Sequence, residues 1–182
     1  MTLISLNKIS TLTSDICKIK WFANVGKEID HNLNDNIEHY CQALALDTKT
    51  KQVNNWQEAI EIINDKDWNK VAWEKEEKEK ENLLNILLKN KNEKEVLCYL
   101  QALTEESTKI TDALSIEGLD KNDVQFQYYS KVAAGSAAIS CYQAALALAT
   151  NQLSSHIFIS KYEIFKSGHW PLVIKNNIFN IF

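Results

Sequence analysis

The end of the chain constrains the fold more than any other segment, because the pattern changes there from helical to extended. Helical periodicity stops at Gly168, and a His-Trp-Pro turn follows. Two short apolar runs, residues 172–174 and 178–182, are then separated by Lys-Asn-Asn. This pattern predicts a small β-hairpin over residues 172–182, with its apolar side chains buried on a helical body.

Proline and glycine, the residues that most often end helices, are scarce in this chain. The 182 residues contain one proline, Pro171, and four glycines. This scarcity favours long helices over a turn-rich β sandwich. We therefore expect a mainly α fold: a single-domain helical bundle of about six or seven helices over residues 1–182, with a small C-terminal β-hairpin.

Apolar spacing and capping residues give the expected helices. They cover residues 11–20, 29–46, a segment after Asn54 or Asn55, a segment from Asp65 or Asp67 to about 88, and residues 93–116, 123–150 and 155–166. The alternating charges of residues 74–81 indicate an exposed helix held by ion pairs between neighbouring turns. The helix over 132–148 has small or apolar residues on nearly every face, which predicts a central helix with a close contact at Gly135.

Charge and composition narrow the classes of function. All twenty basic residues are lysines, so the chain has no guanidinium fork for phosphate, and nucleic-acid binding is disfavoured. The net charge is −4, and residues 28–67 hold nine acids against three lysines. We expect no signal peptide and no membrane span, since the closest run, 132–149, is interrupted by polar residues. Scattered cysteines without a C-x-x-C pair favour a reducing cytoplasm.

A metal site is the first chemical alternative. His31, Asp35 and His39 recur every four residues on one predicted helix face, and such side chains can bind zinc. Three ligands on one straight helix, however, span about 12 Å, too far to share one ion without outside ligands. An exposed polar stripe explains the spacing as well, so we assign no metal and no cofactor.

Motifs for nucleophilic catalysis, nucleotide binding and di-iron chemistry are absent from the sequence. His169 follows a helix end and can be an acid or base in a cleft, but a histidine there commonly complements the helix dipole. His156 has no evident partner. The five tryptophans lie at helical spacing or among acids, which favours core positions over base stacking.

Two stretches carry a resemblance. Residues 20–27, Lys-Trp-Phe-Ala-Asn-Val-Gly-Lys, and residues 166–171, Lys-Ser-Gly-His-Trp-Pro, resemble a family of small uncharacterised bacterial cytoplasmic proteins. A Gly-Trp-Glu-Gly segment typical of that family is absent here, where residues 172–177 stand instead. In being small, acidic, helical and poor in motifs, the chain also looks like the immunity proteins of bacterial toxin–immunity systems.

We therefore expect a cytoplasmic immunity protein, not an enzyme, that binds and neutralises a cognate toxin domain such as a nuclease. The partner surface is predicted at Glu28, Asp30, Asp35 and Glu38, where negative charge is densest. The alternatives are a metal-binding or hydrolytic enzyme that uses His31, Asp35 and His39, and a helical scaffold. Neither nucleic acid nor membrane is expected as a partner, and the oligomeric state is left open.

Overall fold

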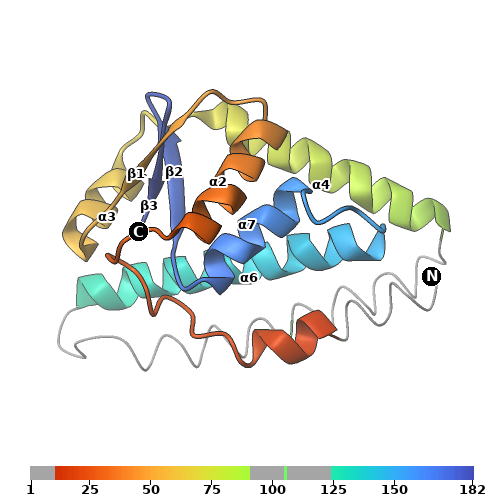
Figure 1. Cartoon of the computed structure of the whole chain (residues 1–182), viewed down its shortest axis with the longest axis horizontal. Coiled ribbons are helices and arrows are strands. Elements are labelled where there is room, and N and C mark those ends of the chain that lie inside the picture. The colour runs from red at the N-terminus through yellow and green to blue at the C-terminus, as the bar shows by residue number, and fades with distance from the viewer. Residues whose placement is uncertain (1–10, 91–104, 106–123) are drawn as a thin grey trace. The chain divides into compact units, whose positions relative to one another are not determined.

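The computed structural model describes residues 11–90, 105 and 124–182, and helices dominate this part of the chain (Figure 1). A helical segment covers residues 11–16. The longer helices are α2 (His31–Ala43), α3 (Trp56–Asn64), α4 (Lys70–Asn90), α6 (Val124–Ala149) and α7 (Ile157–Lys166). Three short strands, β1 (Lys49–Gln52), β2 (Pro171–Lys175) and β3 (Ile178–Ile181), form one sheet. The predicted mainly α fold is confirmed, while the helix expected over 93–116 lies outside the described residues.

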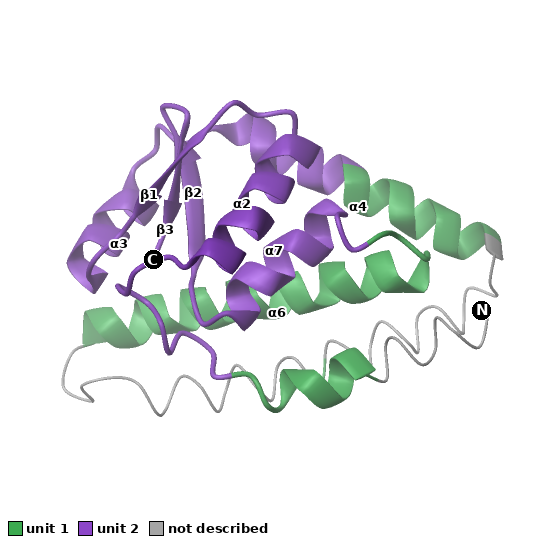
Figure 2. Cartoon of the chain, viewed as in Figure 1, with its two compact units in different colours: residues 1–19, 79–153 green, residues 20–78, 154–182 purple. Residues whose placement is uncertain are grey.

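The chain forms two compact units, which Figure 2 distinguishes by colour. Unit 1 consists of residues 1–19 and 79–153, and unit 2 of residues 20–78 and 154–182. Helix α4 begins in unit 2 and continues into unit 1. Each unit therefore combines segments that are distant in the sequence, and the single domain over residues 1–182 stays a prediction.

The sheet of unit 2 has the strand order β1-β3-β2. β2 and β3 form the predicted antiparallel hairpin, closed by the pair Lys175↔Ile178. The two turn residues, Asn176 and Asn177, have φ values of 49° and 58°, as a type I′ turn requires. β1 joins the other edge of β3 in parallel and was not predicted, because Lys-Thr-Lys-Gln lacks the apolar alternation of a strand.

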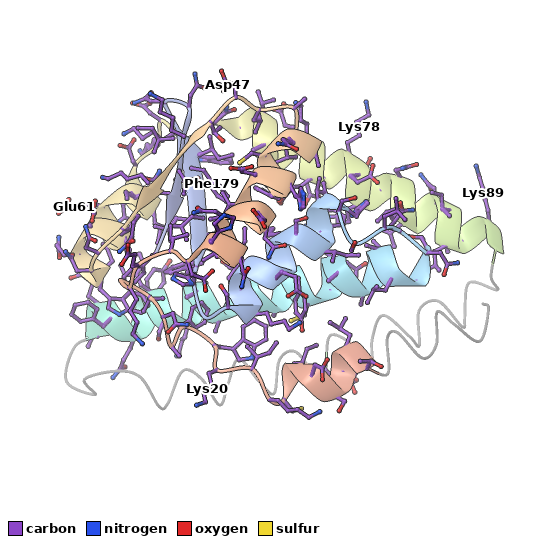
Figure 3. The ribbon with its side chains drawn as sticks, in the orientation of Figure 1. Lys20, Asp47, Glu61, Lys78, Lys89 and Phe179 are labelled. Carbon is purple, nitrogen blue, oxygen red and sulfur yellow. The ribbon has the colours of Figure 1, made fainter. Side chains whose placement is uncertain are left out.

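The core of unit 2 surrounds β3. Three successive residues, Phe179, Asn180 and Ile181, are buried, so both faces of this strand are covered. Figure 3 shows Phe179 among the interior side chains, whereas Asp47 and Glu61 point outward. Helix α2 packs against α7. The predicted burial of the C-terminal apolar side chains is confirmed for Ile174, Phe179, Ile181 and Phe182, whereas Leu172, Val173 and Ile178 are only half-buried.

The two stretches that carry the family resemblance meet in unit 2. The amide of Asn24 donates to the Gly168 carbonyl at 3.0 Å, and its side-chain amide donates to the Ser167 carbonyl at 2.7 Å. Gly168 has a φ of +89°, and a Cβ there would lie 3.1 Å from the Asn24 nitrogen. The aromatic rings of Phe22 and Trp170 are 6.1 Å apart. These motif residues therefore have a structural role, which is to join the start of unit 2 to the end of α7.

Capping side chains begin most helices of unit 2. Of the two predicted caps of α3, Asn54 and Asn55, it is Asn55 that accepts a hydrogen bond from the backbone of Glu58 and starts the helix. His156 caps α7 by accepting a hydrogen bond from the backbone of Phe158. The prediction that Asp65 or Asp67 starts the next helix was wrong. α4 begins later, at Lys70, where Asn69 accepts a hydrogen bond from the backbone of Val71.

Helix α6 is the long apolar helix of unit 1, and its predicted extent is confirmed. The close contact expected at Gly135 was wrong: this residue is exposed, and among the described residues nothing lies within 4 Å of a Cβ built there. By length and composition α6 could cross a membrane, so the expectation that no segment reaches a span was too strict. However, 61 % of its most apolar window is buried inside the structure, as in the core helix of a soluble protein.

Candidate functional site

The four acidic residues predicted to bind a partner are all exposed. Glu28 and Asp30 precede α2, and Asp35 and Glu38 lie on its solvent side. Asp30 also has a structural role, because its carboxylate accepts a 2.8 Å hydrogen bond from the backbone of Leu33 and caps the helix. Helix α2 itself contains no lysine, and Lys27, just before Glu28, is the exposed cation adjacent to these acids in the sequence. We call these four residues the acidic face.

The proposed metal ligands lie on the same helix but do not form a site. The Nδ1 atom of His31 is 3.8 Å from Asp35 Oδ1, and the His31 side chain is 92 % exposed. His39 is also exposed. Within the described residues no group of three His, Cys, Asp or Glu side chains could hold a metal ion. The geometry therefore does not support the metalloenzyme alternative.

His169 is buried rather than set in an open cleft. Its Nδ1 atom lies 3.2 Å from the Ser167 hydroxyl, which donates its own hydrogen to the Ile164 carbonyl at 2.7 Å. With the Ser167 hydrogen directed to Ile164, the Ser167–His169 contact corresponds to the tautomer that carries its hydrogen on Nδ1. Burial lowers the pKa of His169 below its usual value. The Ser167–His169 contact lies at the C-terminal end of α7.

A buried ion pair in unit 2 was missed by the sequence analysis. Lys161 Nζ on α7 lies 2.8 Å and 2.7 Å from the two carboxylate oxygens of Glu76 on α4. The Tyr40 hydroxyl on α2 donates a 2.6 Å hydrogen bond to Glu76 Oε1. Glu76 is only 5 % exposed, so the prediction that residues 74–81 form a uniformly exposed helix was wrong.

This cluster changes the acidity of its tyrosine. The pKa of Tyr40 is raised well above its usual value, first by burial and then by the negative charge and hydrogen bond of Glu76. Tyr40 therefore remains a neutral hydrogen-bond donor.

Burial also raises the pKa of the Cys141 thiol in unit 1 to about 12, which makes this cysteine an inert core residue.

The ion pair faces a pocket of about 330 Å³ that lies wholly within unit 2. Its polar lining consists of Tyr40, Asn69, Glu76 and Lys161. The other lining residues are apolar or aromatic: Ile63, Trp68, Ala72, Trp73, Leu172, Val173, Ile174 and Phe179. A concave site with apolar walls and a few convergent polar groups is typical of small-ligand binding.

One sequence signal could have identified the buried carboxylate. Ala72, Glu76, Leu83 and Leu87 are buried at helical spacing on α4, so Glu76 occupies an apolar stripe despite the charges around it. Lys161 likewise stands between apolar residues of α7. Neither position reveals its partner, because the two residues are 85 positions apart.

Comparisons of the chain with protein-family models, curated proteins and solved structures find no significant match.

Proposed function

We propose that this protein is a cytoplasmic immunity protein that binds and neutralises a cognate bacterial toxin domain through its acidic face. One observation carries the proposal: the four acids of this face are exposed on and just before a helix that contains no lysine. Negative charge presented in this way attracts a basic partner, raises the association rate and disfavours acidic competitors. A nuclease domain, whose substrate is anionic, has the complementary charge.

The apolar side of α2 supports this role by fixing the helix. Leu33, Ile37 and Tyr40 are buried, and α2 packs against α7. The acidic side chains therefore project from a rigid element rather than from a loop, which lowers the entropy lost on binding.

Charge reversal tests the position of the surface. Asp35→Lys combined with Glu38→Lys should slow association with the cognate toxin domain at least tenfold at low salt, and weaken its salt dependence. Asp30 is left unchanged because it caps α2. Surface plasmon resonance at several salt concentrations measures both effects.

The matched control reverses two exposed acids elsewhere in unit 2, Glu61→Lys with Asp67→Lys, and so makes the same change in net charge. Association of this control should change much less than that of the Asp35/Glu38 variant. Equal effects in the two variants would show that only net charge matters and would contradict the acidic face as the interface. Failure of the unaltered protein to protect cells that express the toxin would contradict the immunity function itself.

A further inference from the structure

We propose that the pocket of unit 2 binds a small, neutral aromatic compound that carries a hydroxyl group. The ring would lie between the apolar walls and the hydroxyl group would bind at the Glu76–Lys161 pair. This site is separate from the proposed toxin-binding surface, since Tyr40 reaches the pocket from the buried side of α2 whereas Asp35 and Glu38 lie on the exposed side.

The walls favour an aromatic body. Trp68, Trp73 and Phe179 provide rings, and Ile63 and Leu172 provide aliphatic surface. Trp73 is 53 % exposed, so its ring lies at the rim of the pocket, where a ligand can reach it. The volume of about 330 Å³ lies at the lower end for ligand pockets, which favours a compound of one or two rings.

The polar lining selects for a neutral ligand. Glu76 and Lys161 compensate each other's charge, and Tyr40 stays protonated. An anionic or cationic ligand would bring an unpaired charge beside the largely buried Glu76–Lys161 pair, which is unfavourable. Among the described residues, no further charged side chain lines this pocket.

The remaining hydrogen-bonding capacity selects for a hydroxyl group. Lys161 has three N–H groups, and two are directed to the oxygens of Glu76. Oε1 of Glu76 accepts from both Tyr40 and Lys161, whereas Oε2 accepts from Lys161 alone among the described residues. A hydroxyl group can accept the third hydrogen of Lys161 and donate to Oε2 at the same time, but a carbonyl group can only accept.

Two ring compounds that differ in charge test the proposal. 2-Naphthol is neutral at pH 7 and 2-naphthoate is an anion of similar size. Titration of the full-length protein, followed by the indole N–H signals of its tryptophans in NMR spectra, should show saturable 2-naphthol binding that shifts Trp68 and Trp73 most. 2-Naphthoate should bind at least tenfold more weakly. Equal affinity for the two compounds would overturn the inferred selectivity.

A substitution at the rim of the pocket tests whether the ligand binds there. Trp73→Ala removes an exposed wall residue, so the fold should be retained, and 2-naphthol affinity should fall about tenfold. Tyr128→Ala is the matched control, because Tyr128 is an exposed aromatic residue of α6 outside the pocket. It should leave the affinity unchanged. Absence of saturable 2-naphthol binding, or unchanged affinity in Trp73→Ala, would overturn the proposal, and neither result depends on toxin binding.

Discussion

At the scale of single residues, burial rather than charge pattern decides what a titratable group does. Glu76 stands in a run of alternating charges, yet its carboxylate is enclosed and paired with Lys161. Glu163 and Lys166 show the opposite case: their side chains pair at 3.1 Å but remain 35 % and 42 % exposed. The first pair should therefore contribute strongly to a unique packing of unit 2, and the second should contribute little.

Breaking the buried pair should be costly. Lys161→Met leaves the Glu76 carboxylate buried without its cation, and we expect the free energy of unfolding to fall by about 3–5 kcal/mol. Adding Glu76→Gln removes the second charge and keeps an acceptor for Tyr40, so the double variant should lose less than the sum of the two single variants. Chemical denaturation of the four proteins measures this coupling.

The control for this cycle is Lys166→Met, which breaks the exposed pair with Glu163. Its free energy of unfolding should stay within about 0.5 kcal/mol of the parent. Strictly additive effects of Lys161→Met and Glu76→Gln would contradict the pairing in unit 2.

His169 should make stability depend on pH near neutrality. Its pKa is lowered in the folded protein by burial, against an ordinary value of 6.5. The unfolded chain therefore binds a proton more readily, and stability present above pH 6.5 should be lost as the pH falls toward the folded pKa. His169→Gln should flatten this decline in denaturation curves recorded between pH 7 and pH 5. A parent protein with equal stability across this range would show that His169 is not buried.

At the scale of elements, short-range chemistry sets the helix and turn boundaries. Asp30, Asn55 and His156 each cap a helix through a hydrogen bond to a nearby backbone amide. Asn176 and Asn177 adopt the positive φ values that close the hairpin. These positions need only their neighbours in the sequence, so most of them can be recognised before the fold is known.

Two different substitutions at one position of the hairpin turn should have opposite effects on stability. Asn177 has a φ of +58°, where a β-branched residue is strained, so Asn177→Val should lower the free energy of unfolding by about 1–2 kcal/mol. Asn177→Gly should be at least as stable as the parent, because Asn-Gly suits a type I′ turn. Thermal denaturation monitored by circular dichroism separates the two variants.

Asn34→Val provides the comparison, since Asn34 is exposed within α2 and has no such backbone requirement. It should change stability by less than about 0.5 kcal/mol. Similar losses in Asn34→Val and Asn177→Val would mean that β-branching, and not the turn conformation, explains the effect.

At the scale of the whole molecule, the order of elements in the sequence differs from their assembly. Unit 2 takes α2, β1 and α3 from the first half of the chain and α7, β2 and β3 from its end. The amide of Lys49 donates to the Asn177 carbonyl at 2.9 Å, and that of Val53 donates to the Ile181 carbonyl at 2.7 Å. The N-terminal half therefore cannot complete its core alone.

A fragment ending at residue 90 should confirm this dependence. It keeps α2 but lacks α7 and both strands of the hairpin, so its apolar faces have no partners. We expect weak helical circular dichroism and no cooperative thermal transition, whereas the full chain should melt cooperatively. A cooperative transition in the fragment would show that the interleaved segments are not required for folding.

The sequence alone determined the helical class, the position of α2, the extent of α6, a cap of α3 at Asn54 or Asn55 and the C-terminal hairpin. Each of these depends on apolar periodicity, capping or turn chemistry within a few residues. The close helix contact predicted at Gly135 from the pattern of small residues was wrong. Such a pattern does not specify which other element, if any, packs against the glycine.

Only the tertiary structure decided which distant groups meet. It paired β1 with β3, buried Glu76 against Lys161 and assembled the pocket from segments far apart in the chain. Such contacts join residues that are many tens of positions apart in the sequence. The residues around Lys49 or Glu76 therefore do not indicate which distant residue will be the partner. The acidic face lies between these cases: its charge can be read from residues 28–38, but its exposure follows from the packing of α2 on α7.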